Sequence, residues 1–280
     1  MTEIIRFDGQ VVLVTGAGRG LGRAYARAFA RHGATVVVHD AGVGRDGEGA
    51  DPAVADAVVE EIRAEGCQAV AAYHDLVSAD GCRDLVREVT SRFGRLDVVV
   101  NNAGIVRFEP IGDVTPESLS TIFAINAASA LWISQAAIPT MERQDYGRIV
   151  FTTSGHGLSP SEEPNHLVAY GMTKAAVFGL MNMLANSFVS RNIHVNCIAP
   201  VAATRVFRRS VGEGEFTADQ VAPGVLFLAS RECVQSGIVL TAANGRFAVR
   251  TSSRTTGVDF GQVPVEPEAI RDRWLDIIDA

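Results

Sequence analysis

The sequence lacks the cysteine spacing that marks disulfide frameworks and zinc sites. Its 280 residues contain four cysteines, none of them in a CxxC pair: Cys67, Cys82, Cys197 and Cys233. Disulfide-rich domains and structural zinc sites need closely spaced cysteines. We therefore expect free thiols in a reducing compartment, no metal site, and a cytoplasmic protein.

Long apolar runs and an excess of basic residues are also missing. No unbroken apolar run approaches the roughly 18 residues of a membrane span, and residues 1–6 lack the basic start and apolar stretch of a signal peptide. The chain has 25 Lys and Arg against 32 Asp and Glu, a formal net charge of −7. Binding to nucleic acid or to an anionic membrane needs a basic face, so we expect neither as a partner.

The chain does contain enough hydrophobic sequence for a folded core. Hydrophobic residues make up 47% and charged residues 20%, whereas disorder needs low hydrophobicity and high net charge. Seven short apolar runs predict strands: Val11–Thr15, Thr35–His39, Ala69–Tyr73, Asp97–Asn101, Arg148–Thr153, His194–Ile198 and Ile238–Thr241. The patterns between them predict helices: Gly20–His32, Pro52–Glu65, Ala79–Phe93, Pro116–Arg143, Tyr170–Arg191 and Thr217–Ser230.

This alternation of strands and helices predicts an α/β fold. Continuous Val, Ile, Leu and Ala runs are typical of strands buried on both faces. Their alternation with helices indicates a doubly wound parallel sheet with helices on both faces. We expect one domain over residues 1–250 and a tail over residues 251–280.

The tail is expected to end in a short amphipathic helix. Ile270, Trp274, Ile277 and Ile278 would share one face of it. That face packs on its own domain, docks on a neighbouring subunit, or covers an active-site mouth, and the sequence does not separate these alternatives.

A glycine-rich turn follows the first predicted strand and opens the first predicted helix. It reads Thr15-Gly16-Ala17-Gly18-Arg19-Gly20-Leu21-Gly22. Gly16 permits a sharp turn, Gly20 a close approach of the backbone to a pyrophosphate, and Gly22 tight packing of helix on strand. The helix N-terminus attracts the phosphates. In this strand–turn–helix context the motif predicts dinucleotide binding.

Three charged residues near this turn bear on which dinucleotide binds. Asp40 follows Gly22 by 18 residues, and a carboxylate about 20 residues on binds the adenosine ribose and repels a 2′-phosphate. This favours NAD over NADP. Arg19 favours the opposite, since a guanidinium attracts a 2′-phosphate, unless it pairs with Asp40. Asp75, after the third predicted strand, either reaches the adenine amino group or caps the next helix.

Tyr170 and Lys174 form a candidate proton-transfer pair. They are four residues apart near the start of an apolar helix, which places both side chains on one face. Free tyrosine has a pKa of about 10, and a nearby ammonium favours the phenolate. We therefore expect Lys174 to lower the pKa of Tyr170. The alternative is a solvated helix face.

These motifs occur in a fixed order along the chain. The glycine turn, Asn101-Asn102-Ala103-Gly104, Asn126, Ser154 and Tyr170-Gly171-Met172-Thr173-Lys174 together resemble the short-chain dehydrogenase/reductase family, over residues 7–245. The resemblance implies a Rossmann fold and hydride transfer between a nicotinamide cofactor and an alcohol or carbonyl carbon. It places the tail beyond residue 245 outside the matching part.

The same resemblance implies roles for individual residues. Tyr170 would be the general acid/base and Lys174 would hold the nicotinamide ribose. Ser154 would orient the substrate oxygen, and Asn126 would hold a relay water. The cofactor would lie along a longer set: Gly16, Gly18, Arg19, Gly20, Leu21, Gly22, Asp40, Asp75, Leu76, Asn102, Ala103, Gly104, Tyr170, Lys174 and Pro200.

Further segments are similar to the dehydrogenase units of peroxisomal multifunctional enzymes of type 2. They are residues 6–14, the glycine-rich insertion after Asp40, and residues 58–63, 146–149, 192–200 and 221–223. This implies a (3R)-hydroxyacyl-CoA substrate and NAD. Two alternatives stay open: a hydroxysteroid or terpenoid-alcohol dehydrogenase, and a non-catalytic dinucleotide-sensing protein, because a fold does not fix a function. The intact Asn, Ser, Tyr and Lys set argues against the second.

Two loops carry further expectations. The loop over residues 155–169 is longer than is usual in the family and would alter specificity. A metal site there is the less favoured interpretation, since three or four ligands must converge. The candidate side chains are His156, Glu162, Glu163 and His166. A second loop has basic residues that would meet coenzyme A phosphates or lie in solvent: Arg205, Arg208 and Arg209.

The predicted helices over residues 116–143 and 170–191 are apolar over more than one face. A helix too apolar for one core face suggests a subunit interface. The resemblance implies a homodimer or homotetramer built on these two helices.

Overall fold

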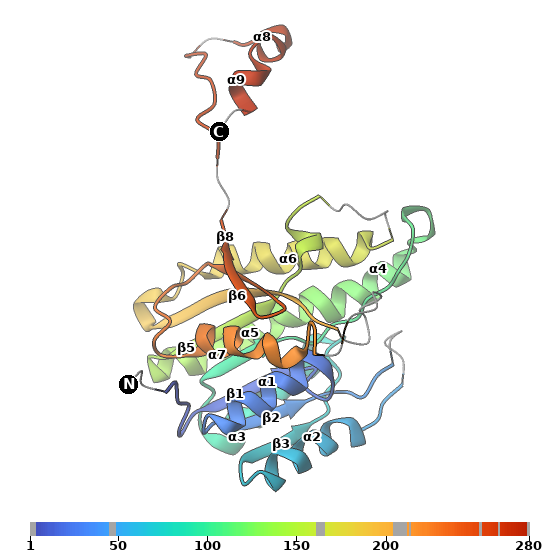
Figure 1. The fold of residues 1–280 in the computed structure, drawn as a ribbon, viewed down its shortest axis with the longest axis vertical. Helices are drawn as coiled ribbons and strands as arrows, with labels where there is room; N and C mark the ends of the chain where they lie inside the picture. The colour runs from blue at the N-terminus through green and yellow to red at the C-terminus, as the bar shows by residue number, and fades with distance from the viewer. Residues whose placement is uncertain are drawn as a thin grey trace. The chain divides into compact units, whose positions relative to one another are not determined.

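The computed structural model describes residues 4–44, 49–160, 166–203, 212, 214–251, 254–262 and 264–278. The chain divides into two compact units, Met1–Val249 and Arg250–Ala280. The first unit is built around one sheet (Figure 1). The second contains two short helices, α8 (Pro267–Asp272) and α9 (Trp274–Ile278), where one helix was expected.

Eight strands form the sheet, in the order β3-β2-β1-β4-β5-β6-β7-β8. Strands β1 to β7 pair in parallel; Val12 of β1, for example, is opposite Val36 on one side and Val98 on the other. All five residues of β1 are buried, as expected for a sheet covered on both faces. The bounds are β1 (Val11–Thr15), β2 (Thr35–His39), β3 (Gln68–Ala72), β4 (Val98–Asn101), β5 (Gly147–Thr152), β6 (Ile193–Val201), β7 (Val239–Ala243) and β8 (Arg246–Arg250).

The predicted doubly wound α/β fold is confirmed, with one strand more than the seven expected. The additional strand, β8, follows β7 after the two residues Asn244 and Gly245, whose φ angles are 48° and 77°. Positive φ at both positions is the requirement of a tight hairpin turn. All five residues of β8 are exposed.

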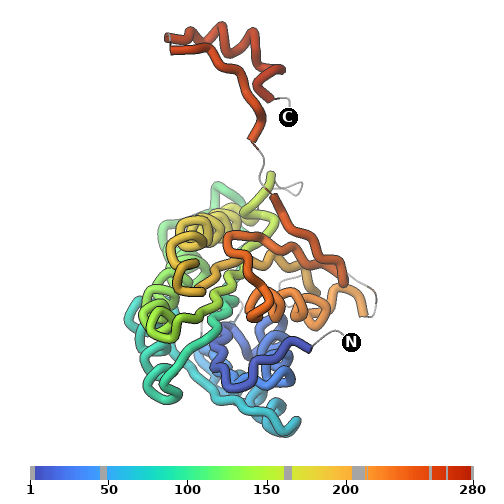
Figure 2. Tube along the Cα trace, turned by 90° about the vertical axis from the view of Figure 1, so that its left-hand side faces the viewer, coloured from blue at the N-terminus to red at the C-terminus, as the bar shows by residue number. Residues whose placement is uncertain are grey.

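Helices cover both faces of the sheet (Figures 1 and 2). One apolar cluster joins the sheet to α1, α2 and α7, and the other joins it to α3, α5 and α6. Thr115 caps α4 by accepting a hydrogen bond from the backbone N–H of Ser118. The bounds are α1 (Gly20–Arg31), α2 (Ala53–Ala64), α3 (Ala79–Phe93), α4 (Pro116–Phe123), α5 (Ser129–Gln144), α6 (Val168–Leu184) and α7 (Ala222–Ala229).

The predicted helix 116–143 exists but is not uniform. Between α4 and α5 the segment Ala124–Ala128 is a π-helix, in which the N–H of Ser129 reaches back to the carbonyl of Ala124. The whole stretch Pro116–Gln144 is long and apolar enough to cross a membrane, although 56% of its most apolar window is buried inside the protein. It is a core helix that packs on the sheet through residues such as Ile133 and Met141.

Two other predicted helices were too long. The helix expected over Tyr170–Arg191 ends at Leu184, where Ser236 donates a hydrogen bond to the carbonyl of Ala185. A separate single turn, Val189–Arg191, follows. The helix expected over Thr217–Ser230 divides into the turn Ala218–Gln220 and α7, because Thr217 and Gln220 form their own capping box.

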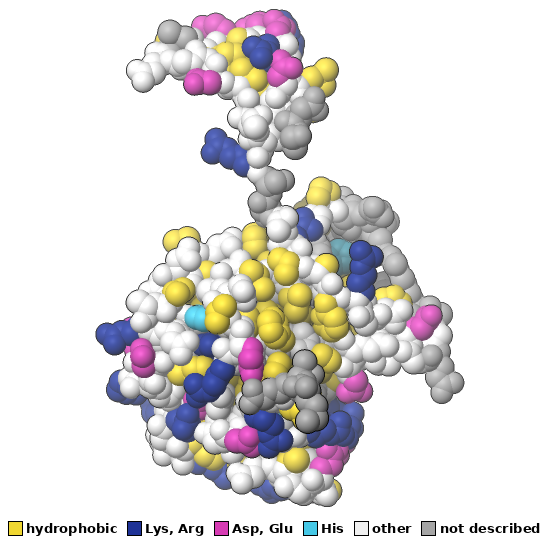
Figure 3. Space-filling model, turned by 60° about the vertical axis from the view of Figure 1, so that its left-hand side comes forward, with side chains coloured by type: hydrophobic (Ala, Val, Ile, Leu, Met, Phe, Trp, Pro, Cys, Tyr) yellow, Lys and Arg dark blue, Asp and Glu magenta, His cyan; other side chains and the backbone are white. Residues whose placement is uncertain are grey.

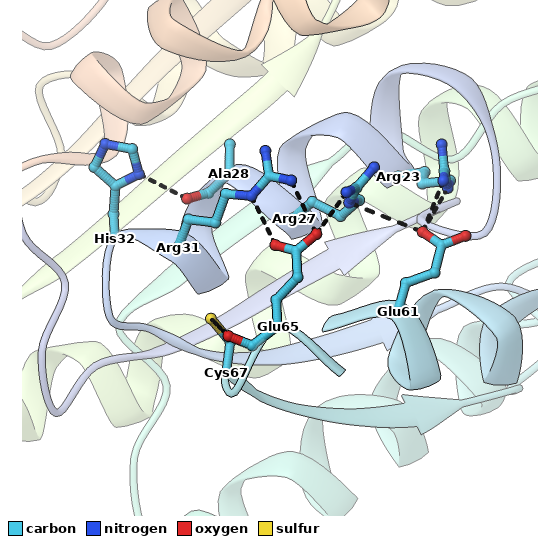
Figure 4. A network of polar contacts seen from close by, with 8 residues as sticks. All are labelled: Arg23, Arg27, Ala28, Arg31, His32, Glu61, Glu65 and Cys67. Carbon is cyan, nitrogen blue, oxygen red and sulfur yellow. Dashed lines mark hydrogen bonds and ion pairs between the residues drawn. The ribbon is translucent and has the colours of Figure 1, made fainter. Parts of the chain in front are cut away.

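A ladder of ion pairs joins α1 to α2 (Figure 4). Arg23 and Arg27 both contact Glu61, and Arg27 and Arg31 both contact Glu65. The arginines are four residues apart on α1 and the glutamates four apart on α2, so one face of each helix carries all of them. The ladder holds α2 against the helix that follows the glycine turn.

Apolar side chains also gather on the surface of the first unit, on the face that carries α7 and β8 (Figure 3). Phe227 of α7 and Phe247 and Val249 of β8 are all among the exposed large hydrophobic residues. On the helices where we expected a subunit interface, Leu131 and Met183 are exposed. Apolar surface suited to association is therefore present on α7 and β8 and also on α5 and α6.

Candidate active site

The glycine turn lies between the carboxyl end of β1 and the start of α1, and its glycines make close backbone contacts. Gly16 and Gly20 have φ angles of 64° and 52°. A Cβ on Gly16 would lie 2.8 Å from the Cα of Ala103, and one on Gly22 would lie 2.1 Å from the carbonyl oxygen of Gly16. Larger residues would therefore push the turn away from both α1 and the loop after β4.

The start of α1 is suited to binding an anion. The N-cap residue Arg19 makes no side-chain cap hydrogen bond, and the first turn contains no acidic residue. The first N–H groups of the helix thus carry partial positive charge with no carboxylate of the first turn beside them. Leu21 is half-buried and packs on the core, which anchors the turn. These features fit the pyrophosphate of a dinucleotide.

Asp40 is fixed beside the glycine turn. Its Oδ2 accepts a hydrogen bond from the N–H of Gly18 at 2.9 Å, and its Oδ1 accepts one from Gly42 at 2.8 Å. The guanidinium of Arg19 donates instead to the carbonyl of Val43 at 3.2 Å. No ion pair joins Arg19 to Asp40, both of which belong to the described part of the chain, so the alternative pairing is wrong.

The segment after β3 contains the next expected cofactor residues. Asp75 Oδ1 accepts a hydrogen bond from the N–H of Val77, which is the local turn that leads into α3. Leu76 is buried, with 6% of its surface exposed. The cap of α3 is Ser78, whose hydroxyl accepts a hydrogen bond from the N–H of Gly81 at 3.0 Å. The expectation that Asp75 caps this helix is therefore wrong, and Asp75 instead closes the turn before it.

The loop after β4 is bound to the end of β1 through Thr15, a residue that the sequence did not single out. Its hydroxyl oxygen accepts hydrogen bonds from the N–H groups of Asn102 and Ala103, both at 3.0 Å. The amide of Asn102 donates to the carbonyls of Thr15 and Gly16. The two loops thus form one rigid edge, and the position of Thr15 directly before Gly16 could have indicated this.

Ser154, Tyr170 and Lys174 meet where β5 ends and α6 begins. Lys174 Nζ donates to the carbonyl of Thr152 at 2.8 Å and lies 5.6 Å from the centre of the Tyr170 ring. The hydroxyl of Thr153 donates to the carbonyl of Lys174, which ties β5 to α6 a second time. The side chain of Ser154 also contacts Tyr170, so the structure brings the three residues together as expected.

Asn126 joins this group from the π-helical segment. Its Oδ1 accepts from the N–H of Ile105 at 2.8 Å, and its Nδ2 donates to the carbonyl of Ile105 and to the hydroxyl of Thr173. A Cβ on Gly104 would lie 3.1 Å from Asn126 Oδ1 and 3.6 Å from Lys174 Nζ. Gly104, Asn126 and Lys174 are therefore neighbours, although 70 residues separate the first from the last in sequence.

Burial decides the charge states in this group. Desolvation raises the pKa of Tyr170, and its contact with Ser154 acts in the opposite direction. Desolvation lowers the pKa of Lys174 to about 8. In the chain without a ligand the pKa of Tyr170 is therefore raised, whereas we expected Lys174 to lower it, because the loss of solvation exceeds the opposing effect of Ser154.

Not every predicted residue can be placed. Pro200 lies near the end of β6 and pairs with Ala242. His156 and His166 are exposed at the two ends of the long loop. Some predicted residues lie outside the described residues: Glu162, Glu163, Arg205, Arg208 and Arg209. Within the described ranges, no three His, Cys, Asp or Glu side chains group as metal ligands.

The strand ends explain why these segments converge. In a parallel sheet the carboxyl ends of all strands lie on one edge, and the connections change direction between β1 and β4. Ligands of such sheets bind at this switch point. The glycine turn, Asp40, the loop after β4 and Ser154 all follow the ends of neighbouring strands.

Comparisons with known proteins agree with this geometry. The short chain dehydrogenase family matches residues 10–214. The peroxisomal multifunctional enzyme type 2 of Mus musculus is 39% identical over 284 residues, which covers 100% of this chain and 38% of that enzyme. A short-chain type dehydrogenase/reductase of Mycobacterium tuberculosis is 36% identical and covers 96% of this chain and 94% of its own length. The similarity extends through the tail, which we expected to lie outside it.

Solved structures are similar as well. A short chain dehydrogenase from Mycobacterium avium has a TM-score of 0.83 at 33% identity and covers 97% of this chain and 95% of its own. A 7α-hydroxysteroid dehydrogenase in complex with NADH has a TM-score of 0.75 at 30% identity, with 86% and 94% covered. A metagenomic short-chain oxidoreductase in complex with NADP has a TM-score of 0.68 at 30% identity, with 82% and 93% covered. The chain thus belongs to the short-chain dehydrogenase/reductase family of oxidoreductases, which act on CH–OH groups with a nicotinamide dinucleotide.

Proposed function

We propose that the protein is an NAD-dependent 3-hydroxyacyl-CoA dehydrogenase specific for the 3R alcohol. The reaction class rests on the group formed by Asn126, Ser154, Tyr170 and Lys174. The substrate class is supported by the similarity to the mouse multifunctional enzyme, which extends over the whole of this chain. Because the chain spans only 38% of that enzyme, the rest of the enzyme's activities have no counterpart in the match.

Tyr170 is the group that moves the substrate proton. In the oxidation direction its deprotonated phenolate oxygen takes the proton of the substrate hydroxyl, and in the reduction direction its hydroxyl returns one. Ser154 orients the same substrate oxygen by a hydrogen bond. When bound, the nicotinamide accepts or donates the hydride on the carbon. The residues suited to hold this cofactor are the glycine turn, Asp40 and the loop after β4.

Lys174 and Asn126 keep the proton path in place. Burial lowers the pKa of Lys174 to about 8, so its amine is largely protonated at neutral pH and can exchange a proton near that pH. Hydrogen bonds to Ile105 and Thr173 fix the side chain of Asn126. Asn126 lies in the π-helical segment. The proton taken up by Tyr170 leaves the site past Lys174 and Asn126.

NAD is favoured over NADP because of Asp40. The carboxylate is oriented by Gly18 and Gly42, at the position where an adenosine ribose would lie. A 2′-phosphate there would face a fixed negative charge. Arg19 is held by Val43 rather than by Asp40, and so does not neutralise that charge.

A hydroxysteroid substrate is the second candidate. It is supported by the similarity to 7α-hydroxysteroid dehydrogenase, which is bound to a 7-oxo bile acid conjugate and NADH in its crystal. The exposed apolar residues of α7, β8 and the two long helices favour a homodimer or homotetramer in either case. We also propose a cytoplasmic location, because the cysteines are not closely paired in sequence.

Absorbance of reduced nicotinamide tests the proposal. Purified protein is mixed with (3R)- or (3S)-hydroxyacyl-CoA of medium chain length, or with a hydroxysteroid, with NAD and NADP in parallel. We expect NADH from the 3R ester alone. Rapid turnover of the steroid with no reaction of either ester would overturn the substrate class and favour the second candidate.

A tyrosine exchange tests the reaction class. Tyr170→Phe should lower kcat roughly 10²- to 10⁴-fold, the range for loss of a general acid/base, without loss of NAD binding. Tyr73→Phe is the matched control, because Tyr73 is exposed, directly follows the edge strand β3 and donates a hydrogen bond to Asp56 of α2. Equal activity of Tyr170→Phe and Tyr73→Phe would contradict the proposed reaction class.

A further inference from the structure

His156 lies beside the candidate acid/base and has no role in the group described so far. Its imidazole ring is 6.3 Å from the ring of Tyr170, centre to centre, and is inclined at 68°, an edge-to-face arrangement. The residue is exposed. Neither of its ring nitrogens hydrogen bonds to any residue that the structure describes.

The backbone fixes this arrangement. His156 is the middle residue of the single turn Gly155–Gly157, which starts at Ser154, and its N–H donates to the Ser154 hydroxyl at 3.3 Å. A Cβ on Gly171 would lie 3.0 Å from the carbonyl oxygen of His156, and one on Gly157 would lie 2.5 Å from the backbone nitrogen of Ala175. The turn is thus pressed onto α6 through two glycines, and the orientation of His156 toward Tyr170 does not depend on its side chain alone.

The chemistry of an imidazole at this position is specific. Ser154 and Tyr170 are proposed to hold the oxygen on the reacting carbon, and this inference rests on that proposed function. In a 3-hydroxyacyl group, one methylene separates the reacting C3 from a second oxygen-bearing carbon, C1. An imidazole has an N–H donor when neutral and two when protonated. A simple secondary alcohol or a hydroxysteroid has no oxygen on the carbon that corresponds to C1 of the acyl group.

We propose that His156 is a specificity-determining residue that donates a hydrogen bond to the C1 oxygen of a 3-hydroxyacyl substrate. Ser154 and Tyr170 then bind the C3 oxygen, and His156 binds the C1 oxygen, so the substrate is held at two points on either side of one methylene. Two substrate types share this chemistry, a thioester carbonyl and a free carboxylate. A carboxylate is a charged acceptor and a thioester carbonyl a neutral one, and a hydrogen bond to the charged acceptor is the stronger.

His156→Phe and His156→Gln test the proposal. Phenylalanine keeps the edge-to-face contact with Tyr170 and removes the donor, whereas glutamine removes the ring and keeps an N–H donor. The readout is the ratio of kcat/KM for a 3-hydroxyacyl thioester to kcat/KM for a 2-alkanol of the same chain length. The free 3-hydroxy acid is measured alongside. His166→Phe is the matched control, the same exchange at the exposed histidine at the other end of the loop.

We expect His156→Phe to lower this ratio roughly 10-fold, the effect of one hydrogen bond, and His156→Gln to restore most of it. His166→Phe should leave the ratio unchanged. A higher kcat/KM for the free acid than for the thioester in the wild type, lost in His156→Phe, would identify a carboxylate as the preferred C1 group, and the opposite preference would identify the thioester.

Equal losses for thioester and alcohol in His156→Phe, or no change in the ratio, would overturn the role of His156. If the wild-type protein oxidises the 2-alkanol or a steroid and not the thioester or the acid, the proposed function itself fails. Failure of the proposed function is seen in the wild-type protein, whereas failure of the role of His156 is seen only in the variant, so the two are distinguishable.

Discussion

Lys174 donates a hydrogen bond from its Nζ atom to the carbonyl oxygen of Thr152 at 2.8 Å, which joins the second turn of α6 to the last residue of β5. The amine is almost fully buried, with 4% of the residue exposed. Lys174 is also the only lysine in the chain. A buried cation with one neutral acceptor is costly to hold in its charged form, and this cost can be measured at a single residue.

Chain labelled with ¹³C at lysine should give one ε-carbon signal, which titrates with a pKa of about 8 without cofactor. The cause is desolvation, which disfavours the charged amine. A midpoint near the ordinary value of 10.5 would contradict the burial of this amine. Free lysine added to the sample serves as an internal reference for the ordinary value.

The same shift predicts how stability depends on pH. The pKa of Lys174 is lower in the folded chain than its usual 10.5, so the unfolded chain binds more protons between pH 8 and 10.5. The stability of the wild type relative to Lys174→Met should therefore rise by roughly 3 kcal/mol as the pH increases through this window. Urea unfolding of both proteins at several pH values measures the difference, and a constant difference would refute the prediction.

Thr173 is expected to position Asn126. Its hydroxyl donates to the carbonyl of Tyr170 at 2.8 Å and accepts from Asn126 Nδ2 at 3.2 Å, and the residue is fully buried. Thr173→Val keeps the shape but leaves an amide hydrogen unpaired, which should lower the free energy of unfolding by about 1–3 kcal/mol. It should also lower kcat and leave the KM for NAD unchanged.

Thr173→Ser is the matched control, because it restores the hydroxyl, and it should recover both kcat and stability. A structural role alone would change unfolding without changing kcat. If Thr173→Val is as active as the wild type, Asn126 does not depend on this hydrogen bond.

The ion-pair ladder between α1 and α2 predicts a stability that depends on salt and pH. Hydrogen bonds from Arg31 and Arg27 lower the pKa of Glu65 to about 2. The contribution of Glu65 is therefore present above its usual pKa of 4.5 and is lost as the pH falls toward 2. Calorimetry should show that Glu65→Gln melts at a lower temperature than the wild type at neutral pH and low ionic strength.

That difference should shrink at high salt, because exposed charges are screened, and below pH 4.5. Glu60→Gln is the control, since Glu60 is exposed on the same helix and forms no ion pair with another described residue. A melting temperature that falls equally in both variants would show that helix propensity, rather than the ladder, is responsible.

Local sequence signals predicted most of the fold. Continuous apolar runs located seven strands to within a few residues, because strands buried on both faces have no alternating pattern. Strand β8 was missed although Asn244-Gly245 is a strong hairpin signal. The exposed side chains of β8 give no buried face from which a strand could be recognised. The end of α6 was missed because it depends on Ser236, a contact between residues 51 positions apart.

The candidate site also has a part that the sequence predicted and a part that it did not. The glycine turn and the Tyr170–Lys174 pair are local patterns, so the sequence located them. Three threonines make contacts with distant residues: Thr15 with Asn102 and Ala103, Thr152 with Lys174, and Thr173 with Asn126. Only the folded chain brings these groups together. The direction of the Tyr170 pKa was wrong because burial cannot be read from a four-residue spacing.

Asp40 supplies the test of cofactor preference. Asp40→Ser removes the fixed negative charge beside the glycine turn, and hydrogen bonds to a charged group are worth about 1.5–3 kcal/mol. The ratio of kcat/KM for NAD to that for NADP should therefore fall roughly 10- to 100-fold. Part of the gain with NADP should come from Arg19, which belongs to the glycine turn and whose guanidinium contacts the carbonyl of Val43, three residues after Asp40.

The double exchange Asp40→Ser with Arg19→Ala should lose that gain. Asp75→Ser tests the remaining cofactor residue, since serine can still accept the hydrogen bond of the turn before α3. An unchanged affinity for NAD in Asp75→Ser would leave Asp75 as a helix-entry residue only. A ratio that stays constant in Asp40→Ser would show that Asp40 orders the loop through Gly18 and Gly42 and does not select the cofactor.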